Sequence, residues 1–355
     1  MPSNSIDQVF VKDFDFLPGS QVVTSSELEA AIKIDMPRGA LEKLTGIKTR
    51  RFWPSDTLPS QVASEVAQKV LERNPKWISK IGLLINFSVS RDYFEPATSV
   101  LVHRRLGLST KCMCFDISNA CIGFSNALMV AASMIRSGVI EAALLVAAET
   151  VRGLVDSTID KINKLGNFCQ QELISYLPVL TLGSGAVAFL VTKEEEEGVK
   201  RPLAFAYESE SRLADLCEGN GDYCIADYVF KKLEQIADRS PIMRTEARKL
   251  IQQASFVGKR VWKALQNLLG WTSKTIDRIV CHQVGRQVDK AWYDTVGLDK
   301  DKEITIYQDF GNMVSCALPA ALVVGSRQGL IKPNDKVLTL GFGSGLNAIF
   351  TAWKW

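Results

Sequence analysis

The sequence predicts an α/β protein made of two similar halves. Two observations indicate this class: short apolar runs alternate with helical stretches along the chain, and three segments recur in the same order in both halves. The chain has 355 residues, which is long for one hydrophobic core and natural for two fused units.

The apolar runs at residues 82–85, 142–148 and 337–340 predict strands that are buried on both faces. Helical stretches are expected at 62–73, 125–136 and 242–269. The stretch 125–136 is apolar almost all round, so we expect a helix buried between two sheets, with Gly138 ending it.

The internal repeat supports the same architecture. Residues 81–91 align without gaps to residues 276–286, and the Gly-rich segment 180–186 resembles 338–345. Residues 115–121 and 307–312 lie between these pairs, so the order strand, strand-turn-helix and Gly-rich strand occurs twice. This order predicts an internal duplication, with halves at 1–197 and 198–355 that meet at the acidic run 194–197.

Two segments interrupt the repeat, at 151–175 and 213–245. They carry mixed polar and aromatic residues without a clean strand pattern. Two interpretations stay open: the segments cover a substrate pocket, or they are surface helices without a role in binding.

Composition excludes several classes of protein. A net charge of +3, from 42 basic and 39 acidic residues, predicts no nucleic-acid partner. We expect no signal peptide and no transmembrane segment, since no apolar run approaches about 18 residues. The eight cysteines are scattered through apolar segments, which is typical of reduced thiols in a cytoplasmic protein. Cys112 and Cys114 have no partner cluster nearby, so no metal site is expected.

The most informative residue is Cys121, at the predicted turn from a strand into the helix 125–136. The N-terminus of a helix favours negative charge, so we expect a lowered thiol pKa and a nucleophilic thiolate here. The alternative is that Cys121 is a small buried apolar residue, the usual fate of a free cysteine.

His282 and Asn312 are the expected polar partners of this cysteine. His282 follows a buried strand, whereas His103 lies beside Arg104 and Arg105 in a polar patch and is expected to be exposed. A neutral histidine N–H and an asparagine amide N–H can both point at one oxygen and stabilise an enolate. The alternatives are a core histidine and a turn asparagine.

A second oxyanion hole needs backbone N–H groups. The Cys121 N–H and the loop of Gly343, Ser344 and Gly345 are the candidates, because glycine lets a backbone approach closely.

Together these pieces resemble the thiolase superfamily, in particular its β-ketoacyl synthase III-like branch. The resemblance rests on residues 119–124, His282-Gln283, Gly311-Asn312, 341–345 and 45–51, and it extends over nearly the whole chain. It implies a five-layered αβαβα fold made of two similar halves, a homodimer, and a Cys121–His282–Asn312 site.

Within that branch, residues 81–96 and 341–347 resemble the OleA family more closely. The sequence His282-Gln283-Val284-Gly285-Arg286 also departs from the usual His-Gln-Ala-Asn of synthase III. The resemblance implies an acyltransferase that joins two fatty acyl-CoA molecules by a non-decarboxylative Claisen condensation. The product is a 2-alkyl-3-oxo acid of a long-chain hydrocarbon pathway. It assigns Glu95 as the base, which reaches the partner subunit's site; from the residues alone, Glu95 is a surface carboxylate.

The resemblance implies no cofactor beyond acyl-CoA as substrate, and it leaves other functions open. The first is decarboxylative condensation with a malonyl thioester, and the second is a non-catalytic partner subunit. A degradative thiolase is disfavoured, because the last Gly-rich loop lacks a second cysteine. An acyl carrier protein as donor and contacts with downstream enzymes also stay open. The basic candidates for phosphate contact are Arg50, Arg51, Arg104, Arg105, Lys259 and Arg260.

Overall fold

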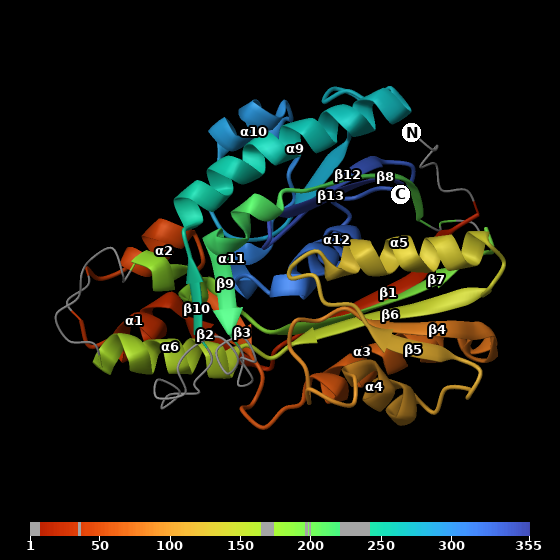
Figure 1. Cartoon of the computed structure of the whole chain (residues 1–355), viewed down its shortest axis with the longest axis horizontal. Helices are drawn as coiled ribbons and strands as arrows, with labels where there is room; N and C mark the ends of the chain where they lie inside the picture. Colours follow the sequence, from red (N-terminus) through yellow and green to blue (C-terminus); the bar gives the residue numbers. More distant parts are fainter. Residues whose placement is uncertain (1–7, 35–36, 165–173, 196–197, 199, 221–241) are drawn as a thin grey trace.

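A computed structural model describes residues 8–34, 37–164, 174–195, 198, 200–220 and 242–355. Figure 1 shows five layers, in which two sheets alternate with three layers of helices. Helices α3 and α4 cover the outer face of one sheet, α9 and α10 cover the outer face of the other, and α5 and α12 lie between the sheets. The predicted five-layered αβαβα fold is confirmed.

The first sheet has the strand order β1-β7-β6-β4-β5. Its strands are β1 (Phe10–Pro18), β7 (Gly185–Thr192), β6 (Ala142–Glu149), β4 (Ile81–Asn86) and β5 (Met113–Asp116). Strands β6, β4 and β5 are parallel, and β7 runs antiparallel to both of its neighbours. Every residue of β6 and β7 is buried, as expected for strands covered by helices on both faces.

The second sheet has the order β11-β12-β13-β8. Its strands are β11 (Arg278–Cys281), β12 (Lys336–Gly343), β13 (Asn347–Lys354) and β8 (Arg201–Ser209). A parallel pair followed by antiparallel strands repeats the arrangement of β4, β6, β7 and β1. The proposed junction near residue 197 lies between β7 and β8, although residues 196 and 197 themselves are outside the described residues.

The central layer forms the largest core. Helices α5 (Gly123–Arg136) and α12 (Ala317–Arg327) pack apolar residues against both sheets, including Leu128 and Ala321. The outer helices are α3 (Pro59–Arg73), α4 (Thr98–Leu106), α9 (Ala247–Leu269) and α10 (Lys290–Val296). As expected, α5 is buried between the sheets and ends just before Gly138, whose φ is 73°.

The remaining elements complete the described chain. They are β2 (Gln21–Thr24), α1 (Ser25–Ala31), α2 (Ala40–Thr45), β3 (Thr49–Phe52), η1 (Pro75–Lys80), α6 (Arg152–Lys164), η2 (Leu177–Thr181), η3 (Ser211–Leu216), β9 (Cys217–Asn220), β10 (Ile242–Thr245), η5 (Lys300–Lys302), α11 (Tyr307–Phe310) and η6 (Val314–Cys316). Parts of both predicted insertions, 165–173 and 221–241, lie outside the described residues.

Two sequence-based expectations were wrong in detail. Residues 242–245 form strand β10 and not the first turn of a helix, because Ile242–Thr245 pairs antiparallel with β9. Helix α9 begins only at Ala247. Residues 180 and 181 end the 3-10 helix η2, so only residues 185 and 186 of the first Gly-rich segment belong to a strand, at the start of β7.

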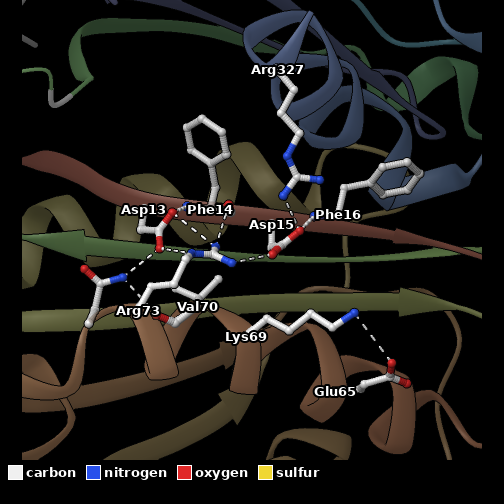
Figure 2. Close-up of polar contacts among 10 residues, drawn as sticks. Asp13, Phe14, Asp15, Phe16, Glu65, Lys69, Val70, Arg73 and Arg327 are labelled. Carbon is white, nitrogen blue, oxygen red and sulfur yellow. Dashed lines mark hydrogen bonds and ion pairs between the residues drawn. The ribbon is translucent and has the colours of Figure 1, made fainter.

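A charged cluster ties β1 to helices of two different layers (Figure 2). The carboxylate of Asp15 accepts hydrogen bonds from Arg73 of α3, at 2.8 Å, and from Arg327 of α12. Burial raises the pKa of Asp15, but the hydrogen bonds from the two arginines outweigh it, so the pKa is lowered overall. Arg73 also binds Asp13, which strengthens this cluster.

Candidate active site

Cys121 lies at the turn between β5 and α5, where the backbone is constrained. Ala120 has a φ of 46°, a left-handed conformation that is uncommon for a residue with a side chain. At Gly123 an added Cβ would lie 2.4 Å from the carbonyl oxygen of Phe87, so only glycine fits. This close approach places the start of α5, and the cysteine before it, directly over the end of β4.

The electrostatics of Cys121 differ from the expectation. Burial raises the pKa of its thiol, and the nearby Cys217 and Glu149 raise it further. The thiol pKa is therefore raised and not lowered as predicted, because desolvation of the thiolate is the largest cause.

The Gly-rich loop packs against the cysteine turn, as the sequence suggested. A Cβ added at Gly343 would lie 3.3 Å from the oxygen of Asn119 and 3.5 Å from the Cβ of Ala120. The Asn347 side chain, at the start of β13, donates to the Asn119 amide oxygen at 3.2 Å. The backbone groups proposed for an oxyanion hole, on Cys121 and on the 343–345 loop, thus belong to two segments in contact.

His282 is buried and follows β11, next to the Gly-rich strand β12. Its backbone N–H donates to Leu340 at 3.0 Å, and the Nδ1 atom has no hydrogen-bond partner in the described part of the chain. Burial lowers the pKa of His282 to about 4, so the ring is neutral at pH 7. His103 is only partly exposed, contrary to expectation, since its Nε2 lies 3.1 Å from the oxygen of Ser109.

Asn312 is held from both sides. Its backbone bonds to Thr181 and Gly183 of the first half at 2.8 and 2.9 Å. Its side-chain oxygen accepts the N–H of Val314 at 2.9 Å, which directs the NH₂ group away from that loop. Val314 has a φ of 51°, an outlier for a β-branched residue of the kind that clusters at functional sites.

Glu149 is a buried acid that the sequence analysis missed. It ends β6, is 0% exposed, and accepts hydrogen bonds from Val89, Ser90 and Ser315. Burial raises the pKa of Glu149, and the hydrogen bonds offset this only in part. A single charged residue at the end of an otherwise apolar buried strand is the signal that could have revealed it.

Glu95 lies on the surface, in the loop between β4 and α4. Within a single chain it is therefore not buried together with the other candidate site residues. The end of this loop is fixed by Asp116, whose carboxylate accepts the N–H groups of Thr98 and Ser99 at the start of α4. Asp116 is also the last residue of β5, five residues before Cys121. Tyr93 and Phe94 beside Glu95 are 51% and 59% exposed.

The basic residues proposed for phosphate contact are not gathered at one place by the described contacts. Arg50 is fully buried, which lowers its pKa to about 10, and Arg260 pairs with Glu208. A surface cavity of about 410 Å³ is lined instead by Lys43, Lys48 and Arg286, which the sequence analysis did not select.

The described part of the chain shows neither a metal cluster nor a membrane-spanning helix. Within the described ranges, no three His, Cys, Asp or Glu side chains are grouped to hold a metal ion, and no helix has the length and apolarity to cross a bilayer. Six cysteines belong to this part of the chain and carry free thiols, whereas Cys169 and Cys224 lie outside it.

The chain is similar to known proteins over its whole length. Residues 115–211 and 267–355 match the family 3-oxoacyl-[acyl-carrier-protein (ACP)] synthase III and its C-terminal region. It is 31% identical to the acyl-CoA:acyl-CoA alkyltransferase of Shewanella oneidensis, over 98% of this chain and 99% of the relative. The Xanthomonas campestris enzyme of the same name is 32% identical over 94% of each chain. A β-ketoacyl-[acyl-carrier-protein] synthase III of Neisseria gonorrhoeae is 27% identical over 93% of each chain.

Solved structures agree with these relatives. An OleA structure from Xanthomonas campestris superposes with a TM-score of 0.89 at 30% identity, covering 100% of this chain and 99% of that one. Another, with bound lauric acid and lauroyl-CoA, has a TM-score of 0.87 and covers 99% and 100%. The chain therefore belongs to the OleA family of acyl-CoA:acyl-CoA alkyltransferases, within the β-ketoacyl synthase III-like branch of the thiolase superfamily, and is an acyltransferase of the condensing type.

Proposed function

We propose that this protein joins two fatty acyl-CoA molecules head to head, without decarboxylation, through an acyl-Cys121 intermediate. The contact between the Cys121 turn and the loop of Gly343, Ser344 and Gly345 carries the proposal. This contact supports an oxyanion hole made of backbone N–H groups from both segments, which would stabilise the negative charge on the thioester oxygen.

In the first step, the Cys121 sulfur attacks the thioester carbon of one acyl-CoA, and CoA leaves as its thiolate. The thiol proton passes to this thiolate, so free CoA is released as its thiol. Because burial raises the pKa of the Cys121 thiol, loss of this proton accompanies the attack and does not precede it.

In the second step, Glu95 of the other subunit removes the α-proton of a second acyl-CoA. His282 and Asn312 donate hydrogen bonds to the enolate oxygen, and the low pKa of His282 suits a neutral donor. The enolate carbon attacks the acyl-Cys121 carbonyl, and the cysteine leaves as a thiolate. Hydrolysis of the remaining CoA thioester gives the 2-alkyl-3-oxo acid. No step requires a cofactor or a metal.

The proposal includes a homodimer formed through β5. This strand is the edge of the first sheet, and Met113 on it is 53% exposed. An open edge strand offers unpaired backbone groups to a second chain. A two-fold pair across β5 puts the exposed Glu95 loop of each subunit beside the strand that leads to the other Cys121.

Lys43, Lys48 and Arg286 are proposed to bind the phosphates of CoA. They line one cavity, and Arg286 is fixed there by a 3.2 Å hydrogen bond to the carbonyl oxygen of Lys43. These three positive charges would equally suit the phosphate of the phosphopantetheine on an acyl carrier protein. Offering acyl-CoA and acyl carrier protein thioesters separately therefore tests which one donates the acyl group.

The decisive experiment is incubation with one long-chain acyl-CoA, with and without malonyl thioester, followed by mass spectrometry of Cys121 and of the product. The expected result is acyl-Cys121 and a doubled β-keto product without malonyl thioester. Acyl-Cys121 with a product only when malonyl thioester is present would instead establish synthase III chemistry. An absence of acyl transfer from every thioester would instead support the alternative of a non-catalytic partner subunit.

Glu95 is tested by mixing subunits. Glu95→Ala and Cys121→Ala dimers should each be inactive, whereas a random mixture should regain about a quarter of wild-type activity, since only hybrid dimers contain one complete site. No recovery in a mixture shown to contain hybrids would exclude a base that acts across the dimer.

A further inference from the structure

We propose that Glu149 is a positioning residue for the condensation step, which holds the loop of Glu95 and the loop of Asn312 in one fixed relation. This inference rests on the proposed function, since it concerns the step in which those two loops act. In the proposed function, Glu95 and Asn312 act only in this step and not in the first acyl transfer to Cys121.

The contacts of Glu149 use its whole carboxyl group. Oε1 accepts the N–H of Val89 at 2.9 Å and the hydroxyl of Ser315. Oε2 accepts the N–H of Ser90 at 3.0 Å and the Ser90 hydroxyl at 2.8 Å. Each oxygen therefore has one backbone N–H group, which can only donate, and one serine hydroxyl as partners, so both oxygens act as acceptors.

Three of these four donors lie at the start of the loop that carries Glu95: the N–H groups of Val89 and Ser90 and the Ser90 hydroxyl. Val89 and Ser90 come three and four residues after the end of β4, and the Ser90 hydroxyl also accepts the N–H of Thr150 at 3.0 Å. The start of the loop is thus clamped to the end of β6, while Asp116 fixes its far end at α4. Glu95 lies between these two anchors.

The fourth donor, the Ser315 hydroxyl, belongs to the loop of Asn312 and fixes that loop to Glu149. Ser315 comes three residues after Asn312 and directly after Val314, whose left-handed backbone donates to the Asn312 amide oxygen. Such a conformation persists only when its surroundings hold it. The bond from Ser315 to Glu149 supplies such a hold, so the direction of the Asn312 NH₂ group depends on Glu149.

An amide cannot replace this carboxylate. In Glu149→Gln, the new NH₂ group faces at least one backbone N–H, and two donors cannot bond to each other. Because the site is fully buried, water does not compensate, and one of the loops shifts. A shift of about 1 Å at a positioned group is enough to lower a rate roughly a hundredfold.

The test separates the two half-reactions in the full-length dimer. Myristoyl-CoA is the probe: acyl transfer is followed as the burst of free CoA and the mass of Cys121, and α-proton removal as deuterium uptake from D₂O. In Glu149→Gln we expect acyl transfer to be no slower than in wild type, because loss of the Glu149 charge removes one cause of the raised Cys121 pKa. We expect α-exchange and product formation to be lowered by at least about thirtyfold. Glu149→Asp should recover part of the loss, because it restores an acceptor-only group.

Two further variants keep the test meaningful if Glu149→Gln folds poorly. Ser315→Ala removes only the bond to the Asn312 loop and should lower α-exchange about tenfold, with little change in acyl transfer. Asp15→Asn is the matched control, because Asp15 is another buried carboxylate of the same sheet, on the edge strand β1 opposite β5. It should lower the unfolding temperature and leave the ratio of the two half-reactions unchanged.

The inference is overturned if the Glu149 and Ser315 variants lower both half-reactions by one factor, in proportion to their loss of stability, as Asp15→Asn does. It is equally overturned if they leave both rates unchanged. Failure of the proposed function has a different signature: the wild-type enzyme itself would show no α-exchange and no doubled product.

Discussion

The Asn347 amide donates a hydrogen bond to the Asn119 amide oxygen, with 3.2 Å between the nitrogen and the oxygen and 228 residues of sequence between the two side chains. Asn119 in turn donates to Asn126 of α5 at 2.9 Å. The chain of amides joins the nucleophile turn of one half to the Gly-rich loop of the other. Its geometry sets the spacing of the proposed oxyanion hole.

Asn347→Asp keeps the size of this side chain and replaces the donor by an acceptor that faces Asn119. We expect kcat/KM for acyl-CoA to fall about tenfold, equivalent to about 1.4 kcal/mol of transition-state stabilisation. Steady-state kinetics measure the loss. Asn163→Asp, which removes a similar donor to Ala31 far from the turn, is the control and should leave kcat/KM unchanged.

His282 makes stability depend on pH. Its folded pKa of about 4 lies below the ordinary 6.5, so the unfolded chain binds more protons between these values. The neutral ring therefore contributes fully above pH 6.5, and this contribution is lost as the pH falls towards 4. Between pH 7.5 and pH 5, wild type should lose about 2 kcal/mol more unfolding free energy than His282→Gln. Urea unfolding at both pH values measures this; equal losses would contradict a neutral buried ring.

Gly123→Ala should destabilise the fold by more than about 3 kcal/mol, because its Cβ would lie 2.4 Å from the backbone oxygen of Phe87. Gly153→Ala is the matched control within helix α6, where the added Cβ meets nothing within 4 Å. There we expect a gain of about 0.5–1 kcal/mol. Thermal unfolding of both variants tests whether close approach, and not glycine content, decides the effect.

The cluster in Figure 2 predicts a stability defect separate from catalysis. Arg327→Met removes one of two arginines from the buried Asp15 carboxylate and should lower the unfolding free energy by about 1–3 kcal/mol. Since the pKa of Asp15 is lowered, its contribution is present at neutral pH and is lost as the pH falls below about 4. Denaturant titrations at pH 7 and pH 3.5 should show the defect shrinking at the lower pH.

Met113→Lys should weaken the proposed dimer, because it places a charge on the exposed edge strand β5. Sedimentation should then show monomers at low micromolar concentration. If Glu95 acts across the dimer, product formation should fall with dimerisation, and high protein concentration should restore it. Full activity of a proven monomer would contradict that arrangement.

Much of this molecule could be predicted from sequence. Alternating apolar runs and helical stretches indicated the layers, and the repeat indicated two related sheets, because these patterns depend on neighbouring residues. The turn of Cys121, the strand before His282 and the Gly-rich loop are likewise local patterns. Each lies where the sequence placed it.

Tertiary structure decided what depends on distant segments. Residues 242–245 became a strand because β9 pairs with them. The pKa of Cys121 is raised and not lowered, because burial among other elements desolvates the thiolate. Glu149 gains its contacts from Val89 and Ser90, about 60 residues before it, and from Ser315, 166 residues after it. Desolvation and long-range hydrogen bonds exist only once the chain has folded, so no local pattern encodes them.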